Sequence, residues 1–264
     1  MDAPVIAVVD YHKGNLSSVA RGLARAGAEA LVTDDPDRIR AADGIVLPGV
    51  GSFYDAITFM RDHGQDAAVI DAVAGGEGTP FLGICLGLQL LFERGDEGVP
   101  ASGKTEGASL PSDGDASLAP TAADAVSKGA HLAPGTVFSA GERRWVSGLG
   151  VLAGSCTILP ARRLKVPHVG WDQVHLTERG RICPLLEGFA EGSNVYFTHS
   201  FALDDDVEPQ DVAAVTHYGR NFGSVVWHGN LYGCQFHPEK SSNHGHEILR
   251  NFVSIASRAR GAHA

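Results

Sequence analysis

The sequence predicts an α/β fold in which a largely parallel central sheet carries helices on both faces. Three observations lead to this expectation. The first half of the chain alternates short apolar runs with stretches of helical spacing. One apolar run passes into a helical stretch through the sharp turn Gly83-Ile84-Cys85-Leu86-Gly87. The second half returns to strand-like runs and closes with one further amphipathic helix.

The elements of the first half follow one another in short steps. Residues 4–9 are an apolar run typical of a buried strand, and residues 15–28 place apolar side chains on one helical face. After these we expect strands at 30–33 and 44–47, a helical region over 52–74, a strand at 80–84 and a helix over 86–94.

The second half begins after a segment of different composition. From about 97 to 147 the chain is rich in Gly, Ala, Ser, Pro and Asp, so it buries too little apolar surface to offset the entropy of ordering. We therefore expect one domain over 1–264 with a flexible surface insertion at about 97–147. Beyond it the periodicity predicts strands at 151–158, 194–198, 212–216, 224–228 and 231–236, then a helix over 246–257.

Composition and charge restrict the function classes. The 264 residues carry a net charge of -10, which repels phosphate backbones and argues against nucleic acid as a partner. The sequence has no apolar run long enough to span a membrane, and its N-terminus reads as a strand. The four cysteines are widely spaced, which argues against a zinc site or a disulfide framework. We expect no cofactor, no metal, no membrane contact and a cytoplasmic location.

Cys85 is the candidate nucleophile. It occupies the centre of a G-x-C-x-G turn, the cysteine counterpart of the G-x-S-x-G elbow. Such a turn forces its middle residue into a strained conformation and pushes the side chain outward, while glycines let the two backbones approach. A helix N-terminus after the thiol favours the thiolate, and the N–H of Leu86 is available to an oxyanion. The alternative is a buried cysteine in a glycine-rich turn.

His237 and Glu239 are the candidate base and its orienting carboxylate. They follow an apolar strand, and residues i and i+2 of extended chain point to the same side. A carboxylate beside the imidazole fixes its tautomer and stabilises the imidazolium formed when the thiol loses its proton. Any single one of twelve histidines is weak evidence, but the pair together with the cysteine elbow is much stronger.

Two further features complete the candidate site. Residues 48–51 read Pro-Gly-Val-Gly between a strand and a helix, so Gly49 and Val50 can turn a peptide N–H toward a developing oxyanion. Gln89 lies four residues after Cys85, on the helix face next to the nucleophile, where its amide could bind the polar end of an amino-acid substrate. As isolated motifs, both are weak signals.

Together these residues resemble the class I (triad) glutamine amidotransferases, and most closely the glutaminase subunits of imidazole glycerol phosphate synthase. The elbow and His-Pro-Glu belong to the whole superfamily, whereas DY-x-x-GN, VPH-x-GW and HPEKS are typical of this group. The matching stretches are VVDYHKGNLSSV (8–19), LPGVGSF (47–53), FLGICLGLQLLFE (81–93), LKVPHVGWDQV (164–174), VYFTHSF (195–201) and YGCQFHPEKSSNHG (232–245).

The resemblance implies a flavodoxin-like, mostly parallel sheet and a defined reaction. Glutamine would be hydrolysed to glutamate and ammonia through a glutamyl thioester. A (β/α)8 cyclase subunit, joined in a heterodimer, would use the ammonia to make imidazole glycerol phosphate and an aminoimidazole carboxamide ribotide in histidine biosynthesis.

By matching motif positions, the resemblance also assigns roles to individual residues. The triad would be Cys85, His237 and Glu239. The remaining assignments are Gly49, Val50 and Leu86 for the oxyanion, Gln89, Glu97, Ser200 and Phe201 for substrate glutamine, and Gly14, Asn15, Trp171 and Lys240 for the cyclase interface.

Three positions depart from the family pattern. Asp172 stands where the family usually has Asn, Phe201 where it has Tyr, and Cys234 where it has Val. Asp172 puts in doubt an amide contact to the partner, Phe201 lacks one hydroxyl, and Cys234 reads as a small buried hydrophobe. None of the three belongs to the triad.

Three alternatives stay open. The chain could be the glutaminase of anthranilate, carbamoyl phosphate or GMP synthesis, although Lys240 and the VPHVGW stretch speak against this. It could be a cysteine hydrolase of another amide, such as a gamma-glutamyl peptide. It could also be an inactive binding subunit, against which the intact Cys–His–Glu set argues.

Overall fold

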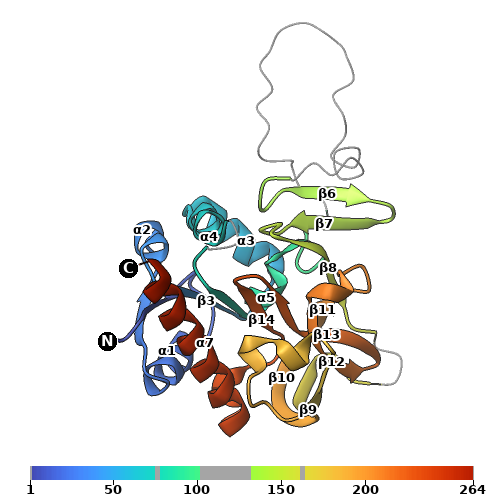
Figure 1. Ribbon diagram of the computed structural model, residues 1–264. Coiled ribbons are helices and arrows are strands. Elements are labelled where there is room, and N and C mark those ends of the chain that lie inside the picture. The colour runs from blue at the N-terminus through green and yellow to red at the C-terminus, as the bar shows by residue number, and fades with distance from the viewer. Residues whose placement is uncertain (1, 75–77, 102–131, 161–163, 264) are drawn as a thin grey trace, which may run out of the picture.

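A computed structural model describes residues 2–74, 78–101, 132–160 and 164–263. Its central sheet has nine strands in the order β10-β9-β12-β13-β14-β4-β3-β1-β2 (Figure 1). A second sheet has the order β11-β8-β5-β7-β6. The strands of the central sheet are β1 (Val5–Val9), β2 (Glu29–Thr33), β3 (Gly44–Gly49), β4 (Phe81–Cys85), β9 (His168–Leu176), β10 (Ser193–His199), β12 (Val212–Tyr218), β13 (Arg220–His228) and β14 (Leu231–Cys234).

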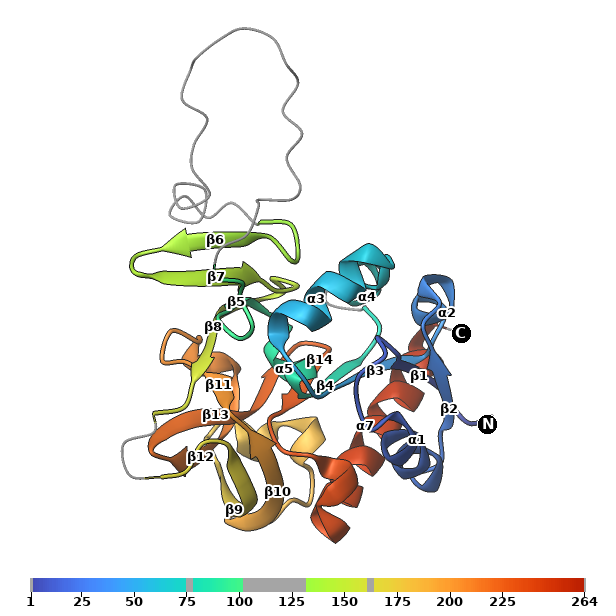
Figure 2. The same ribbon diagram turned by 180° about the vertical axis from the view of Figure 1, so that it is seen from behind.

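Strands β2, β1, β3, β4 and β14 are mutually parallel, as the alternating first half predicts. On one face lie α1 (Leu16–Arg25) and α7 (Ser242–His263), and on the other α2 (Pro36–Arg40), α3 (Phe53–Asp62) and α4 (Gln65–Val73) (Figures 1 and 2). Because both faces are covered, successive residues of one strand enter different cores, which is why these strands are apolar throughout.

The remaining strands of the central sheet pair antiparallel. β13 follows β12 through a tight turn at Gly219, which has φ 73°, and its far edge pairs with β14. β9 and β10 form the outer edge beyond β12. The predicted strands of the second half are all found, and the sheet as a whole is a parallel half extended by an antiparallel one.

Two predicted helices are shorter than expected. The region 52–74 divides into α3 and α4 at Gly64, whose left-handed backbone (φ 69°) ends one helix and starts the next. The helix expected over 86–94 ends at Gln89 (α5, Leu86–Gln89), and β5 (Phe92–Gly95) begins three residues later. Tertiary pairing of β5 with β7 and β8 overrides the local helical pattern.

The second sheet contains part of the segment expected to be a flexible insertion. Of that segment, 102–131 lie outside the described residues. Its last part forms β6 (Val137–Ala140) and β7 (Arg143–Ser147), a hairpin held by the buried side chains of Phe138 and Trp145. The expected boundary at 147 is therefore too late, because these apolar residues belong to the folded domain. The other strands here are β8 (Leu152–Ile158) and β11 (Phe201–Leu203).

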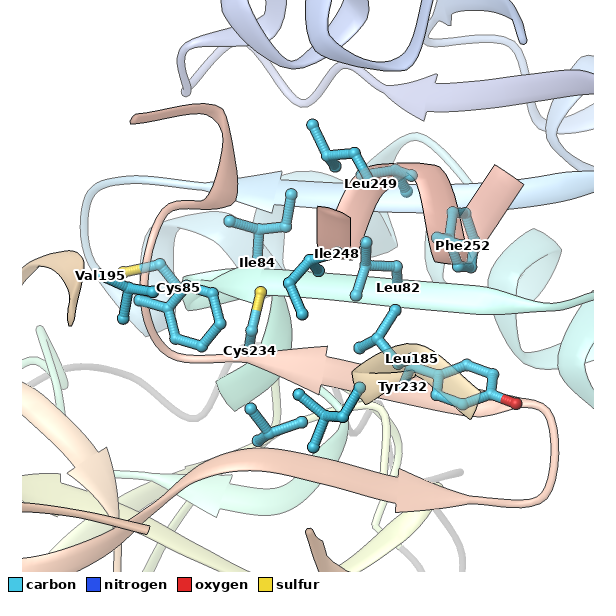
Figure 3. Close-up of a cluster of buried hydrophobic side chains, with 14 of the residues drawn as sticks. Leu82, Ile84, Cys85, Leu185, Val195, Tyr232, Cys234, Ile248, Leu249 and Phe252 are labelled. Carbon is cyan, nitrogen blue, oxygen red and sulfur yellow. The ribbon is translucent and has the colours of Figure 1, made fainter. Parts of the chain in front are cut away.

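Figure 3 shows the core between the parallel strands and α7. Leu82 and Ile84 of β4 face Ile248 and Phe252 of the helix. Cys234 lies in the middle of this cluster and is fully buried, which confirms its interpretation as a small buried hydrophobe. The cluster reaches Cys85 at the end of β4, so the helix packing supports the strand that carries the candidate nucleophile.

Gly87→Ala should destabilise the fold strongly, because a Cβ on Gly87 would lie 1.7 Å from the carbonyl oxygen of Leu47. We expect a loss of about 3 kcal/mol or more in the free energy of unfolding, measured by urea titration. Gly261→Ala is the matched control, since a Cβ there meets nothing within 4 Å; it should change stability by less than about 0.5 kcal/mol. Equal stability of the two variants would contradict the close packing described for the elbow.

Candidate active site

Cys85 forms the sharp elbow that the sequence predicts. It ends β4 and precedes α5 with φ 54° and ψ −108°, a conformation unfavourable for a residue with a side chain. A Cβ on Gly83 would lie 2.5 Å from the carbonyl oxygen of Gly87, so the strand and the helix approach too closely for any other residue type. Because α5 has only four residues, its dipole is short, and the backbone N–H groups of its first turn, which begins at Leu86, follow the thiol directly.

His237 and Glu239 come from the chain that follows β14. β14 lies beside β4 in parallel, with Cys234 opposite Ile84, so the two strand ends reach the same edge of the sheet. His237 Nδ1 donates to Glu239 Oε1 at 2.9 Å, and the two side chains are 3% and 1% exposed. The predicted pairing of base and carboxylate is therefore present.

Nδ1 of His237 is engaged by Glu239, so Nε2 is the ring nitrogen that is available to accept a proton. Within the described part of the chain, Nε2 is buried and has no hydrogen-bond partner. Burial alone would lower the pKa of His237, but the negative charges of a Cys85 thiolate and of Glu239 outweigh it and raise this pKa. The pair thus favours an imidazolium once a proton reaches Nε2.

The sulfur of Cys85 has two hydrogen-bond contacts that sequence reasoning did not anticipate. It donates to the carbonyl oxygen of Thr198 at 3.9 Å, and it accepts from Nε2 of Gln235 at 3.4 Å. Gln235 lies two residues before His237, in a bend that follows β14, and its side chain reaches the sulfur at the elbow. Its place between the strand that ends at Cys234 and the His-Pro-Glu motif is the sequence signal that could have identified it.

A cavity of about 290 Å³ opens beside the sulfur. All four residues assigned to substrate binding line it, together with Val50 and Leu86 of the assigned oxyanion region. Gly49 lies behind this wall, where a Cβ would be 2.5 Å from the hydroxyl oxygen of Tyr11. The full lining is Val50, Gly51, Cys85, Leu86, Gln89, Glu97, Pro167, Thr198, His199, Ser200 and Phe201.

Glu97 lies beside the N-terminus of α3. Its Oε2 accepts from the backbone N–H of Phe53 at 3.2 Å, in the first turn of that helix. Partial burial, and to a smaller degree the nearby Asp96 and Asp55, raise the pKa of Glu97 to about 7, although the Phe53 N–H opposes the shift. A carboxylate that titrates near neutrality thus faces the cavity.

Gln89 faces the cavity with a defined orientation. Its Nε2 donates to the carbonyl oxygen of Phe201 at 2.8 Å and to Oε1 of Gln235 at 3.0 Å. Both amide hydrogens are engaged by the protein, so Gln89 offers a ligand only its acceptor oxygen. Gln89 is 3% exposed, so it is part of the buried wall of the site.

Two buried histidines support the wall formed by residues 198–201. His199 Nδ1 donates to the carbonyl oxygen of Phe201 at 2.8 Å, and His168 Nδ1 lies 3.3 Å from His199 Nε2. Burial lowers the pKa of His199 to about 3, which keeps that ring neutral. His168 Nε2 lies 3.4 Å from Asp172, so the carboxylate that departs from the family pattern has a partner within the chain.

The residues assigned to the partner interface fall into two groups. Trp171 is 53% exposed and meets Tyr196 edge to face at 6.2 Å, while Lys240 Nζ lies 5.7 Å from the same ring. Gly14 and Asn15 belong to another segment, the loop between β1 and α1. The structure thus brings Trp171 and Lys240 together on one surface.

Neither a metal-binding cluster nor a membrane-spanning helix is found in the part of the chain that the structure describes. No group of three or more His, Cys, Asp or Glu side chains there is arranged to hold a metal ion. No helix in that part of the chain is both long and apolar enough to cross a membrane.

Alkylation should distinguish Cys85 from the other thiols, because it alone of the four lines the cavity. Burial raises the pKa of Cys183 to about 11 and also raises the pKa values of Cys156 and Cys234. At about pH 7.5 we expect iodoacetamide to modify Cys85 roughly tenfold faster than it modifies the other three cysteines. Mass spectrometry of the cysteine-containing peptides measures the four rates. Equal rates at all four thiols would contradict the described burial.

Comparison with known proteins agrees with this geometry. The model of the family "Glutamine amidotransferase class-I" matches residues 7–256. The HisH subunit of imidazole glycerol phosphate synthase from Moorella thermoacetica is 38% identical over 257 residues, covering 97% of this chain and 98% of that protein. The HisH subunit from Gloeobacter violaceus is 39% identical over 259 residues, covering 98% and 93%.

A solved structure shows the same fold at greater sequence distance. The crystal structure of a glutamine amidotransferase superposes with a TM-score of 0.60 at 15% identity, covering 96% of this chain and 98% of that one. Similarity over nearly the full length thus extends to sequence and to fold. The chain belongs to the class-I glutamine amidotransferase family, in the group of the HisH subunits of imidazole glycerol phosphate synthase.

Proposed function

We propose that this chain is the glutaminase subunit of imidazole glycerol phosphate synthase and hydrolyses glutamine to glutamate and ammonia with Cys85, His237 and Glu239. One observation carries the proposal: the elbow thiol lines a cavity that the assigned substrate residues also line, and it acts on the pKa of His237, whose ring is hydrogen-bonded to Glu239. The HisH relatives, similar from end to end, support the same reaction.

The geometry supports a two-step acyl transfer. His237 Nε2 takes the thiol proton, and Glu239 stabilises the imidazolium. The thiolate adds to the side-chain carbonyl carbon of glutamine, and the negative oxygen is held by the N–H group of Leu86, with Gly49 and Val50 as the other residues assigned to the oxyanion. Collapse breaks the C–N bond, and His237 returns the proton to the leaving ammonia. Water, deprotonated by His237, then hydrolyses the glutamyl thioester and frees glutamate.

The remaining assignments concern the substrate and the partner. Glu97 is suited to bind the α-ammonium group of glutamine, and Gln89 contributes its free acceptor oxygen. We place the cyclase subunit on the surface of Trp171 and Lys240, with Gly14 and Asn15 as further contacts. The cyclase would consume the ammonia to make imidazole glycerol phosphate and an aminoimidazole carboxamide ribotide. Four free thiols fit a reducing cytoplasm.

Glutamate release from glutamine tests this function. With a purified cyclase subunit and its nucleotide ligand, the wild-type chain should produce glutamate faster than it does alone. Cys85→Ala should lose the activity by roughly 10⁴-fold or more, because it removes the nucleophile. Stimulation by an amidotransferase partner of another pathway, or activity that survives in Cys85→Ala, would overturn the assignment.

The KM for glutamine should depend on the ionisation of Glu97. Its carboxyl pKa is raised to about 7, so the carboxylate that binds an ammonium group is present above pH 7 and lost below it. We expect KM to rise by roughly tenfold for each pH unit below 7, while kcat changes less. In Glu97→Gln this dependence should disappear and KM should be high at every pH. A flat wild-type KM between about pH 6 and 8 would contradict the role of Glu97.

Trp171→Ala should weaken the complex with the cyclase, because exposed aromatic side chains dominate the energetics of interfaces. We expect Kd to rise by roughly 30-fold in calorimetric titration, without loss of thermal stability of the free chain. Ile182→Ala is the matched control: Ile182 is a 68% exposed apolar side chain that is not among the residues assigned to the interface. Equal effects of the two substitutions would remove the reason to place the cyclase at Trp171.

A further inference from the structure

We infer that Gln235 is a hydrogen-bond donor to the nucleophile: its side-chain N–H stabilises the Cys85 thiolate, and Gln89 holds the amide in the orientation that this requires. The inference deepens the proposed function and rests on it for the chemical role of the thiolate. The contact itself is independent of the substrate, because it exists in the free chain at 3.4 Å between Nε2 and Sγ.

The backbone places Gln235 where it can act on the sulfur. It follows β14 directly, its own N–H donates to the carbonyl oxygen of Ser224 at 2.9 Å, and it is fully buried. His237 is two residues further on, past the bend at 235–236. Gln235 donates to the sulfur, and the charge on Cys85 raises the pKa of His237, so both side chains act on the same thiol. The sulfur is therefore approached by two groups of neighbouring residues, a proton acceptor and a fixed donor.

A single backbone carbonyl fixes the orientation of the amide. The oxygen of Phe201 can only accept, so the atom of Gln89 that faces it must be Nε2. The second hydrogen of that nitrogen points to Gln235, so the atom of Gln235 at 3.0 Å must be Oε1. The other end of the Gln235 amide, which faces the sulfur, is then Nε2. Flipping the Gln235 amide would set its Nε2 against Nε2 of Gln89, two donors facing each other, and is excluded by the network.

The chemistry requires such a donor. A buried thiolate is costly unless its charge is compensated, and His237 supplies only one partner. An amide N–H cannot release its proton at neutral pH, so it stabilises the sulfur anion without competing for the base's function. Hydrogen bonds strengthen when the acceptor becomes charged, and this one is already in place before the thiol ionises. It therefore favours the thiolate over the thiol.

Other groups near the sulfur set the background for a test by pH. The elements packed around Cys85 present His237 and Glu239 after β14, His199 from β10 and Tyr11 from the chain after β1. Cys234 of β14 and Glu97 at the cavity complete the set. A substitution at Gln235 leaves all of these side chains in the protein. A change in the pH profile of Cys85 alkylation therefore reports the loss of the Gln235 hydrogen-bond donor.

The test measures the rate of Cys85 alkylation by iodoacetamide in the full chain between about pH 5 and 10, by mass spectrometry of the Cys85 peptide. Gln235→Met keeps the length of the side chain and removes the donor. We expect the midpoint of its rate profile to move up by about one pH unit, so that alkylation below the midpoint slows by roughly tenfold. Gln235→Glu, which faces the sulfur with a carboxylate, should move it further.

Asn251→Leu is the matched control, because Asn251 also cross-links two carbonyl oxygens, those of Leu185 and Glu187, away from the site. It should lower stability and leave the alkylation profile unchanged. A Gln235→Met profile that superposes on the wild-type profile would overturn the inference and leave Gln235 with a structural role. The assay contains neither glutamine nor a cyclase. It can therefore contradict the role of Gln235 while the proposed function holds, and it can support that role while the proposed function fails.

A measurement on the unmodified protein covers the case in which the Gln235 variants do not fold. The side-chain amide resonances of ¹⁵N-labelled Gln235 should shift over the pH range in which Cys85 becomes reactive, because the acceptor gains a charge. Alkylated protein should show no such titration. Amide resonances that ignore both the pH and the alkylation would contradict the hydrogen bond to the sulfur.

Discussion

The strained conformation of Cys85 is the constraint on which the rest of the site depends. A residue with φ 54° between a strand and a helix is tolerated only where its surroundings enforce it. Here Gly83 and Gly87 allow the backbones of β4, α5 and β3 to touch, and apolar layers on both faces of the sheet hold these elements in place. The packing of the core therefore holds the Cys85 thiol in its outward-pointing position.

Adjacent parallel strands bring the other groups to that thiol. β3 ends in the Gly49–Val50 turn on one side of β4, and β14 leads to Gln235 and His237 on the other. The end of β10 and the start of β11 form the far wall of the cavity. The residues assigned to the site thus come from the ends of β3, β4, β10 and β14, with Gln89 on α5 and Glu97 after β5. The carbonyl oxygen of Phe201 is linked to the sulfur of Cys85 through Gln89 and Gln235.

The sequence was sufficient to predict the elbow, the His237–Glu239 pair and the parallel half of the sheet, because each depends on residues close together in the chain. The hydrogen bond between His237 and Glu239 is present as expected, but its expected reason is wrong: Glu239 lies in a 3-10 helix, Pro238–Lys240, and not in extended chain. The early end of α5 and the strand β5 were not predictable in this way, because pairing with β7 and β8 decides them over some fifty residues. The hydrogen bonds between Gln89, Gln235 and Cys85 were not predictable for the same reason, because Gln89 contacts Gln235 only in the folded chain.

Formation of a glutamyl thioester on Cys85 is the most direct test of the account. The chain would be mixed with glutamine, the cyclase and its nucleotide ligand, quenched in acid within the first turnovers and analysed by mass spectrometry. A glutamyl group attached to the Cys85 peptide, absent from Cys85→Ala and removed by hydroxylamine, is the predicted result. The experiment would be repeated at low pH, where the deacylation step is slow. If glutamate is produced there with no acylated Cys85, the thiol does not act as the nucleophile.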